Sequence, residues 1–171
     1  KVESVFKWGN RLNLLLAHYY PAQRSTAYEL VQLTLDSLKT TLVKPLGKVR
    51  TPPISVYAFC GFSVSPDSTK MMFFNWPIGP PQDSVNLLVQ VFFFFLESLW
   101  ARKYTLGYAN RNFLVYGCLM RNDGSAFIFG ENYSDKYTAS TQVQEKNIER
   151  IILLMSGKSA RVDLIQLELG D

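Results

Sequence analysis

Histidine and cysteine are scarce in this chain, and their scarcity excludes the commonest catalytic and metal-binding arrangements. The 171 residues include a single histidine, His18, and two cysteines, Cys60 and Cys118. Nucleophilic catalysis needs a nucleophile beside a base that is usually histidine, and the Gly-x-Ser-x-Gly elbow of many serine hydrolases is absent. One histidine and two widely spaced cysteines do not make a conventional zinc ligand set. We therefore expect no metal, no cofactor and no catalytic role for His18.

Phosphate-binding loops are missing as well. The sequence has no Gly-x-Gly-x-x-Gly, and Gly157-Lys158-Ser159 lacks the upstream glycine of a Walker-type loop. Asn122-Asp123-Gly124 is typical of a turn, because the further ligands and the terminal glutamate of a calcium loop are not present. No small-molecule ligand is therefore indicated. One enzymatic alternative stays open, in which Glu97, Glu131 and Asp135 converge for acid–base chemistry, although no motif places them together.

Charge is sparse and mildly positive. Charged residues make up 19% of the chain and the net charge is +4, which permits contact with phosphate or anionic lipid without requiring it. Both cysteines lie within apolar runs, so we expect free buried thiols and an intracellular, reducing location. The first residue is Lys1 and not methionine, so we expect a piece of a longer protein, folded as one domain over residues 1–171.

The apolar stretch Asp83–Tyr104 predicts a buried central helix. Pro80 and Pro81 precede it, and Asp83 or Ser84 can cap its start. Its interior is apolar on nearly every side, as in a helix that other elements enclose within one core. Polar residues interrupt the run and disfavour a membrane span. Valine and phenylalanine also favour sheet, but the length of the segment favours the helix.

The rest of the chain predicts a mixture of helices and hairpins. Helices are predicted over residues 2–20, from Thr26 to Leu42 and from Thr141 to Met155. Strands are predicted at Ile54–Val64, Lys70–Trp76, Phe113–Met120, Ala126–Phe129 and Ile165–Leu169, with turns at Ser65–Ser68 and Asn122–Gly124. The expected fold class is α+β: a single compact domain whose mixed or antiparallel sheet of about five strands combines two hairpins with a C-terminal strand, around a central buried helix with flanking helices.

Two segments are candidate partner surfaces. The proline-rich loop Phe73–Pro81 holds apolar side chains that cannot all pair into a sheet, and they either stay exposed for a partner or fold back over the central helix. The terminal strand can pair with a partner strand if it lies at a sheet edge. The candidate contact residues are Phe74, Trp76 and Ile78 in the loop, and Ile165, Leu167 and Leu169 in the strand.

A basic segment between the predicted helix and the predicted strand is a candidate anion-binding site. It contains Lys39, Lys44, Lys48 and Arg50, and it is either a solvated connection or an electrostatic footprint for nucleic acid or acidic lipid. Aromatic side chains for base stacking are not interleaved with it.

Taken together, the missing catalytic motifs, the low charge and the high aromatic content favour a non-enzymatic protein–protein interaction or scaffold domain that self-associates. Such a motif-poor profile fits an accessory protein, viral or host. The alternative is a nucleic-acid or anionic-membrane binding protein that uses the basic region 39–50.

Overall fold

The computed structural model describes residues 1–50, 59–76, 83–133 and 148–167, and within these ranges the protein contains strands and short 3₁₀ turns but no α-helix. The strands form three four-stranded antiparallel sheets. Each sheet is a meander in which every strand pairs with the strand before it. The expected α+β class is therefore wrong, and the protein is all-β.

The strands follow one another along the chain, sheet by sheet. Sheet I comprises β1 (Val2–Trp8), β2 (Arg11–Tyr20), β3 (Ser25–Thr34) and β4 (Thr40–Arg50). Sheet II comprises β5 (Phe59–Val64), β6 (Lys70–Trp76), β7 (Ser84–Phe93) and β8 (Ser98–Ala109). Sheet III comprises β9 (Phe113–Met120), β10 (Ala126–Tyr133), β11 (Ile148–Ser156) and β12 (Ser159–Leu167). Short 3₁₀ turns cover Pro21–Gln23 and Asn110–Asn112.

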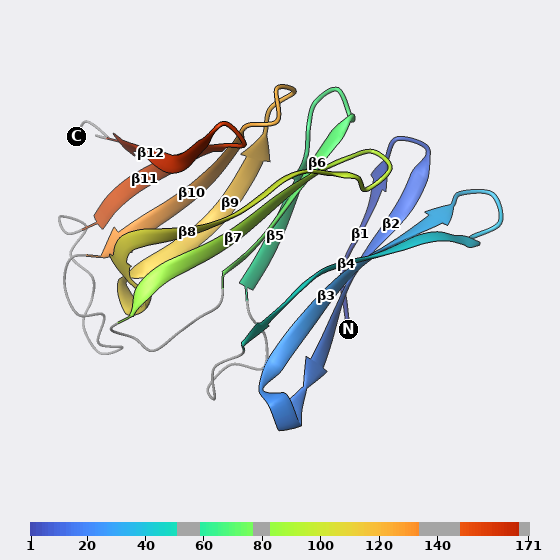
Figure 1. Ribbon diagram of the computed structural model, residues 1–171, viewed down its shortest axis with the longest axis horizontal. Coiled ribbons are helices and arrows are strands. Elements are labelled where there is room, and N and C mark those ends of the chain that lie inside the picture. Colours follow the sequence, from blue (N-terminus) through green and yellow to red (C-terminus); the bar gives the residue numbers. More distant parts are fainter. Residues whose placement is uncertain (51–58, 77–82, 134–147, 168–171) are drawn as a thin grey trace.

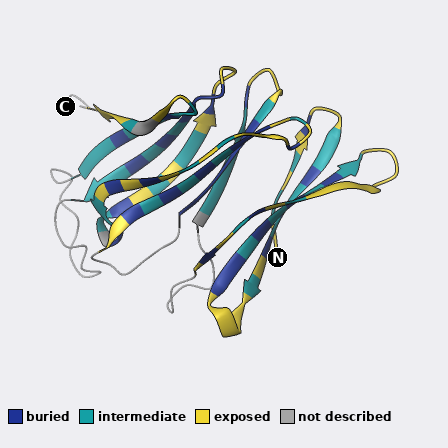
Figure 2. Cartoon of the chain, in the orientation of Figure 1, coloured by how far each residue is buried: buried dark blue, intermediate teal, exposed yellow. Residues whose placement is uncertain are grey.

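The three sheets stand face to face in a row, with sheet II in the middle (Figure 1). Two separate clusters of buried side chains hold the row together, one between sheets I and II and the other between sheets II and III. The expectation of one core around a central helix is therefore wrong. Figure 2 shows burial concentrated along the strands of the middle sheet.

The segment predicted as the central helix is a hairpin. Strand β7 ends at Phe93, the chain turns through residues 94–97, and β8 returns beside it. Because sheet II is covered on both faces, its strands carry apolar side chains at successive positions and lose the polar alternation of a half-exposed strand. A continuous apolar run cannot be assigned to strand or helix by its period alone. Phe92 is buried, whereas Phe95 is 70% exposed at the turn.

The sequence does not predict the turn between β7 and β8, because residues 94–97 include no glycine, asparagine, aspartate or proline. The backbone N–H of Phe93 donates to the carbonyl of Glu97, and the N–H of Leu96 donates to the carbonyl of Phe93. The turn after β9 has the same two bonds, with Gly124 at the position equivalent to Leu96. Both residues have positive φ, 60° for Leu96 and 87° for Gly124. Glycine adopts this conformation without strain, and Leu96 adopts it while its side chain is buried between sheets I and II.

The other predicted helices are also strands. Residues 2–20 form β1 and β2, joined by a two-residue turn at Gly9 and Asn10 in which Gly9 has positive φ. The segment Thr26–Leu42 spans β3, a turn and the start of β4. From the segment Thr141–Met155, residues 148–155 belong to β11 and the earlier ones lie outside the described residues. The capping-box pattern that begins at Thr26 thus occurs here within a strand, and the one that begins at Thr141 lies outside the described residues.

The predicted hairpins are confirmed. Strands β5 and β6 pair around the turn at Ser65–Ser68, and β9 and β10 pair around Asn122–Gly124. The predicted strand Ile54–Val64 is confirmed from Phe59 onward, and its first part lies outside the described residues. The terminal strand is also confirmed as β12, which starts earlier than predicted.

Candidate interaction surfaces

The buried interfaces between the sheets show what a covered face looks like in this protein. Sheet I contributes aromatic and aliphatic side chains such as Trp8, Tyr28 and Leu30, which pack on Phe73 and Phe92 of sheet II. The Trp8 indole Nε1–H donates to the carbonyl of Ser68 over 2.9 Å, across to the turn between β5 and β6. Each interface therefore combines a wide apolar contact with a few directional bonds at its margin.

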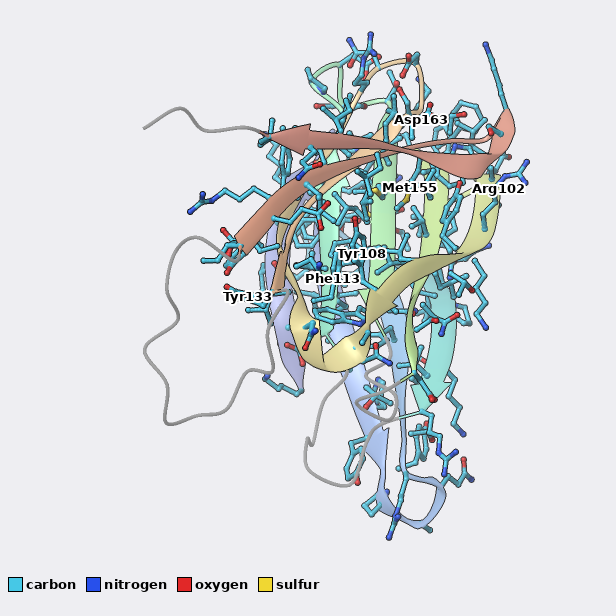
Figure 3. The ribbon with its side chains drawn as sticks, turned by 90° about the vertical axis from the view of Figure 1, so that its left-hand side faces the viewer. Arg102, Tyr108, Phe113, Tyr133, Met155 and Asp163 are labelled. Carbon is cyan, nitrogen blue, oxygen red and sulfur yellow. The ribbon has the colours of Figure 1, made fainter. Side chains whose placement is uncertain are left out.

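The interface between sheets II and III follows the same plan. Trp76 packs edge-on against Phe113, with 5.7 Å between ring centroids, and Tyr108 stacks on Phe113 at 5.4 Å. The Arg102 guanidinium donates to the carbonyl of Gly157 over 2.8 Å, which ties β8 to the turn between β11 and β12. Figure 3 shows Tyr108 and Phe113 close together, with Arg102 farther along β8 toward the start of the strand.

The outer face of sheet I, which points away from sheet II, is also apolar. On β2 the buried residues Asn13, Leu15 and Ala17 alternate with half-buried leucines, and in an antiparallel sheet alternate residues point to opposite faces. The pairing register extends this outer set across β1, β3 and β4. Its apolar members are Val2, Val5, Leu12, Leu14, Leu16, Val31, Leu33, Val43 and Pro45.

The outer face of sheet III has the same character. The residues of β10 that alternate with buried Ala126 and Ile128 point away from sheet II, and their register partners on β9 and β11 share that direction. The apolar members of this face include Leu114, Leu119, Phe127, Phe129, Ile148, Ile152, Leu154, Ile165 and Leu167. Contiguous exposed apolar surface of this kind marks an interaction site.

A polar cluster lies within the outer face of sheet III. The hydroxyls of Tyr116 and Tyr133 donate to Oε2 of Glu131 over 2.7 and 2.8 Å, and Nε of Arg150 lies 3.2 Å from Oε1. Partial burial alone would raise the pKa of Glu131, but the hydrogen bonds from both tyrosines and the charge of Arg150 lower it overall. The cluster therefore holds a charged carboxylate in a fixed position on an otherwise apolar face.

The two predicted partner surfaces have different outcomes. Phe74 and Trp76 belong to β6 and are buried between sheets II and III, so they are not a surface, and Ile78 lies outside the described residues. Ile165 and Leu167 lie on β12, which is the edge strand of sheet III, and both are exposed. Leu169 lies outside the described residues. The terminal strand thus contributes to the outer face of sheet III.

The four predicted anion-binding residues do not form one patch. Between Tyr28 and Glu29 of β3 the register with β4 shifts, so that Leu46 is an extra residue on β4. Such a bulge reverses the direction of the following side chains. Lys44 consequently points inward, with Nζ 5.8 Å from the centroid of the Phe92 ring, whereas Lys48 and Arg50 point outward. Lys39 lies apart, in the turn before β4.

A pocket of about 480 Å³ lies where the first strands of the three sheets converge. Its lining includes Glu3 on β1, Cys60 on β5 and Cys118 on β9, and Glu3 is its one charged member among the described residues. Both cysteines are free. Burial raises the pKa of Cys118 to about 12 and that of Cys60 to about 11, where a hydrogen bond with Tyr28 acts in the opposite direction. Protonated thiols are weak nucleophiles, so the pocket offers no activated cysteine at neutral pH.

The remaining candidate groups for metal binding and acid–base chemistry lie apart from one another in the described residues. Nowhere in the part of the chain that the structure describes do three or more His, Cys, Asp or Glu side chains gather closely enough to hold a metal ion. Glu97 lies in the turn of sheet II and Glu131 on sheet III, and Asp135 is outside the described residues. His18 pairs with Glu29 at 3.3 Å on the outer side of sheet I. Within the described ranges no helix has the length and hydropathy needed to cross a membrane.

Comparison with known proteins gives a likeness in shape only. No family model matches the chain, and no curated protein sequence matches it. An acylaminoacyl peptidase from Pyrococcus horikoshii superposes with a TM-score of 0.54 at 10% identity, over 97% of this chain and 25% of its own. An ACO/RPE65 chimera gives a TM-score of 0.53 at 10% identity, over 91% of this chain and 35% of its own. The sheets resemble propeller blades.

The chain spans between a quarter and about a third of those two structures, and the low identity supports a shared fold alone. In an arrangement of propeller-like blades, the first strand of each sheet lies nearest the common axis. The pocket lined by the first strands β1, β5 and β9 lies at that position. The apolar outer faces escaped the sequence analysis, although a signal existed. Successive leucines at 14–16 are consistent with a strand that is apolar on both sides.

Proposed function

We propose that this chain is a non-enzymatic interaction module, built from propeller-type sheets, that binds protein through the outer faces of sheets I and III. The observation that carries the proposal is that both faces are rich in apolar side chains and that several of these side chains are exposed. On the outer face of sheet I, for example, Val5 is 56% exposed, and on that of sheet III Leu119 is 57% exposed. Covering exposed apolar side chains stabilises a complex, because each Å² of apolar surface removed from water lowers the free energy by about 25 cal/mol.

The location of polar groups supports the same function. Each apolar face carries a small number of charged or hydrogen-bonding groups, among them the Glu131 cluster on sheet III and the His18–Glu29 pair on sheet I. Protein interfaces combine an apolar centre with such groups, which select the partner and fix its orientation. The basic residues favour nucleic acid or acidic lipid less, because Lys44 points inward while Lys48 lies over the Tyr20 ring at 4.7 Å.

The test is the solution mass of the chain across a concentration series, with and without RNA. We expect mass to rise with protein concentration, to be unaffected by RNA, and to fall when either Val5→Glu or Leu119→Glu places a charge on an outer face. Phe95→Glu is the control, because Phe95 is also exposed, at 70%, but lies at the turn of sheet II. A single-chain mass at every concentration, with no fluorescence from an apolar-surface dye such as ANS, would contradict the proposal.

A further inference from the structure

We propose that the partner is a second copy of this chain, bound head to tail, with the outer face of sheet I in one copy packed on the outer face of sheet III in the other. This inference rests on the proposed function, because it names the occupant of the faces described above. Each copy has two outer faces, one on sheet I and one on sheet III. Two copies that make two such contacts form the smallest assembly in which all four of these faces are covered.

The repeat of the fold shows which faces fit each other. Within the chain, one side of each sheet packs on the sheet that follows it, as Leu15 of β2 and Phe74 of β6 do. The opposite side packs on the sheet before it, as Phe73 of β6 and Ile128 of β10 do. The outer face of sheet III is of the first kind and that of sheet I is of the second kind. Their contact would repeat the two interfaces that the chain already contains.

The residues at equivalent positions are of equivalent type. Outward-pointing Phe127 and Phe129 on the second strand of sheet III occupy the places that Met72 and Phe74 hold on the second strand of sheet II. Outward-pointing Leu12, Leu14 and Leu16 on the second strand of sheet I correspond likewise to Met71 and Phe73. Aromatic side chains of sheet III and aliphatic side chains of sheet I would interdigitate, in the way that aromatic, aliphatic and thioether side chains from both sheets pack between sheets II and III.

The positions of polar groups and the fan of the sheets are compatible with this orientation. Lys48 and Arg50 point outward at the end of sheet I where β2 passes into β3. The cluster of Glu131 with Arg150, Tyr116 and Tyr133 lies at the corresponding end of sheet III, where β10 ends, and offers hydrogen-bonding groups there. The first strands of all three sheets line one pocket, so successive sheets fan around a common axis. A head-to-tail contact that repeats such a fan closes into a ring when the rotation completes, and it then has no free end.

The experiment mixes two variants, each of which is expected not to pair when it is alone. Val5→Glu alters only the outer face of sheet I, and Leu119→Glu alters only that of sheet III. In a head-to-tail pair each contact uses one face of each kind, so either variant alone should have the 19.5 kDa mass of one chain. An equimolar mixture retains one contact without a substitution, so pairs of twice that mass should return. Phe95→Glu should pair as the unaltered chain does.

The outcomes separate the inference from the function on which it rests. Loss of pairing in only one of the two variants would indicate contact between like faces and would overturn the head-to-tail arrangement. Loss in both without recovery in the mixture would also overturn it, while contact through the faces would stand. An unaltered chain that stays single would overturn the second copy as partner, and ANS binding that the two variants reduce would then leave the proposed function intact. Val43→Glu and Ile165→Glu, at exposed positions on β4 and β12, give an independent pair if the first variants fold poorly.

Discussion

The run of four phenylalanines at 92–95 provides the sharpest test of the fold. In a helix buried on all sides, all four side chains would be enclosed. In the hairpin, Phe92 is 1% exposed between sheets I and II, whereas Phe95 is 70% exposed at the tip of the turn. We therefore expect Phe92→Ala and Phe95→Ala to differ widely in their effect on the free energy of unfolding.

The magnitudes follow from burial. Removing a phenylalanine side chain from a packed core costs about 3–5 kcal/mol, because apolar contacts are lost and a cavity remains. A substitution at an exposed position without special contacts stays within about 0.5 kcal/mol. For a chain of this size, about 2–4 °C is lost per kcal/mol, so Phe92→Ala should lower the melting temperature by about 6–20 °C and Phe95→Ala by about 2 °C or less. Phe92→Leu keeps most of the volume and should cost about 1.5 kcal/mol or less.

Urea unfolding followed by tryptophan fluorescence measures these differences, because Trp8 and Trp100 report on the two sides of sheet II. Similar losses for Phe92→Ala and Phe95→Ala would mean that both side chains share a buried environment. That result would refute the assignment of strand, turn and strand, and with it the division of the protein into two cores.

Three further predictions concern single groups. Gly9→Ala should destabilise the protein by about 1 kcal/mol or more, because Gly9 has a φ of 58° and an added Cβ would lie 2.3 Å from the Phe94 ring; Gly107→Ala, with nothing within 4 Å, is the control in the same thermal melt. The raised pKa of Cys118, about 12 against an ordinary 9.0, means that its stabilising effect is complete below pH 9.0 and is lost as the pH rises toward 12; urea midpoints at increasing pH should fall less steeply in Cys118→Ala. The lowered pKa of Glu131 gives the opposite dependence, with stability complete above its ordinary 4.5 and lost as the pH falls below it; Glu131→Gln should flatten that acid limb, and an unchanged limb would contradict the role of the tyrosine hydrogen bonds.

The elements that the sequence predicts correctly are those whose turns carry their own signal. Asn122-Asp123-Gly124 supplies glycine at the position of positive φ, and Ser65–Ser68 supplies side chains that satisfy the turn, including the Ser65 hydroxyl bond to Asp67 of 2.6 Å. Both hairpins were therefore visible. The equivalent turn between β7 and β8 has Leu96 at that position, and only its burial between two sheets, which sequence does not show, makes the conformation acceptable.

The basic segment shows a different limit. Spacing of four residues along a strand places Lys44 and Lys48 on the same face, as long as the pairing is regular. The extra residue at Leu46 reverses that relation, and the bulge leaves no mark in the composition around it. Two of the candidate partner residues, Phe74 and Trp76, are buried and not exposed for a related reason. The prolines that follow them favour an exposed loop, whereas β6 continues through Trp76 and both side chains are buried between sheets II and III.

The absence of polar alternation in the strands explains why the sequence predicts helices, and it is also the basis of the proposed function. A sheet with one face in water shows polar alternation, and sheet II lacks it because neighbouring sheets cover both of its faces. Among the described residues, sheets I and III each pack against one other sheet. Successive leucines at 14–16 and the apolar outward residues of β10 and β11 nevertheless lack that alternation too. The lack of polar alternation therefore has two consequences. It makes these strands resemble helices in the sequence, and it leaves the outer faces of sheets I and III rich in apolar side chains. If the outer faces contact solvent and no partner, charged substitutions such as Val5→Glu should leave both the solution mass and the solubility of the protein unchanged.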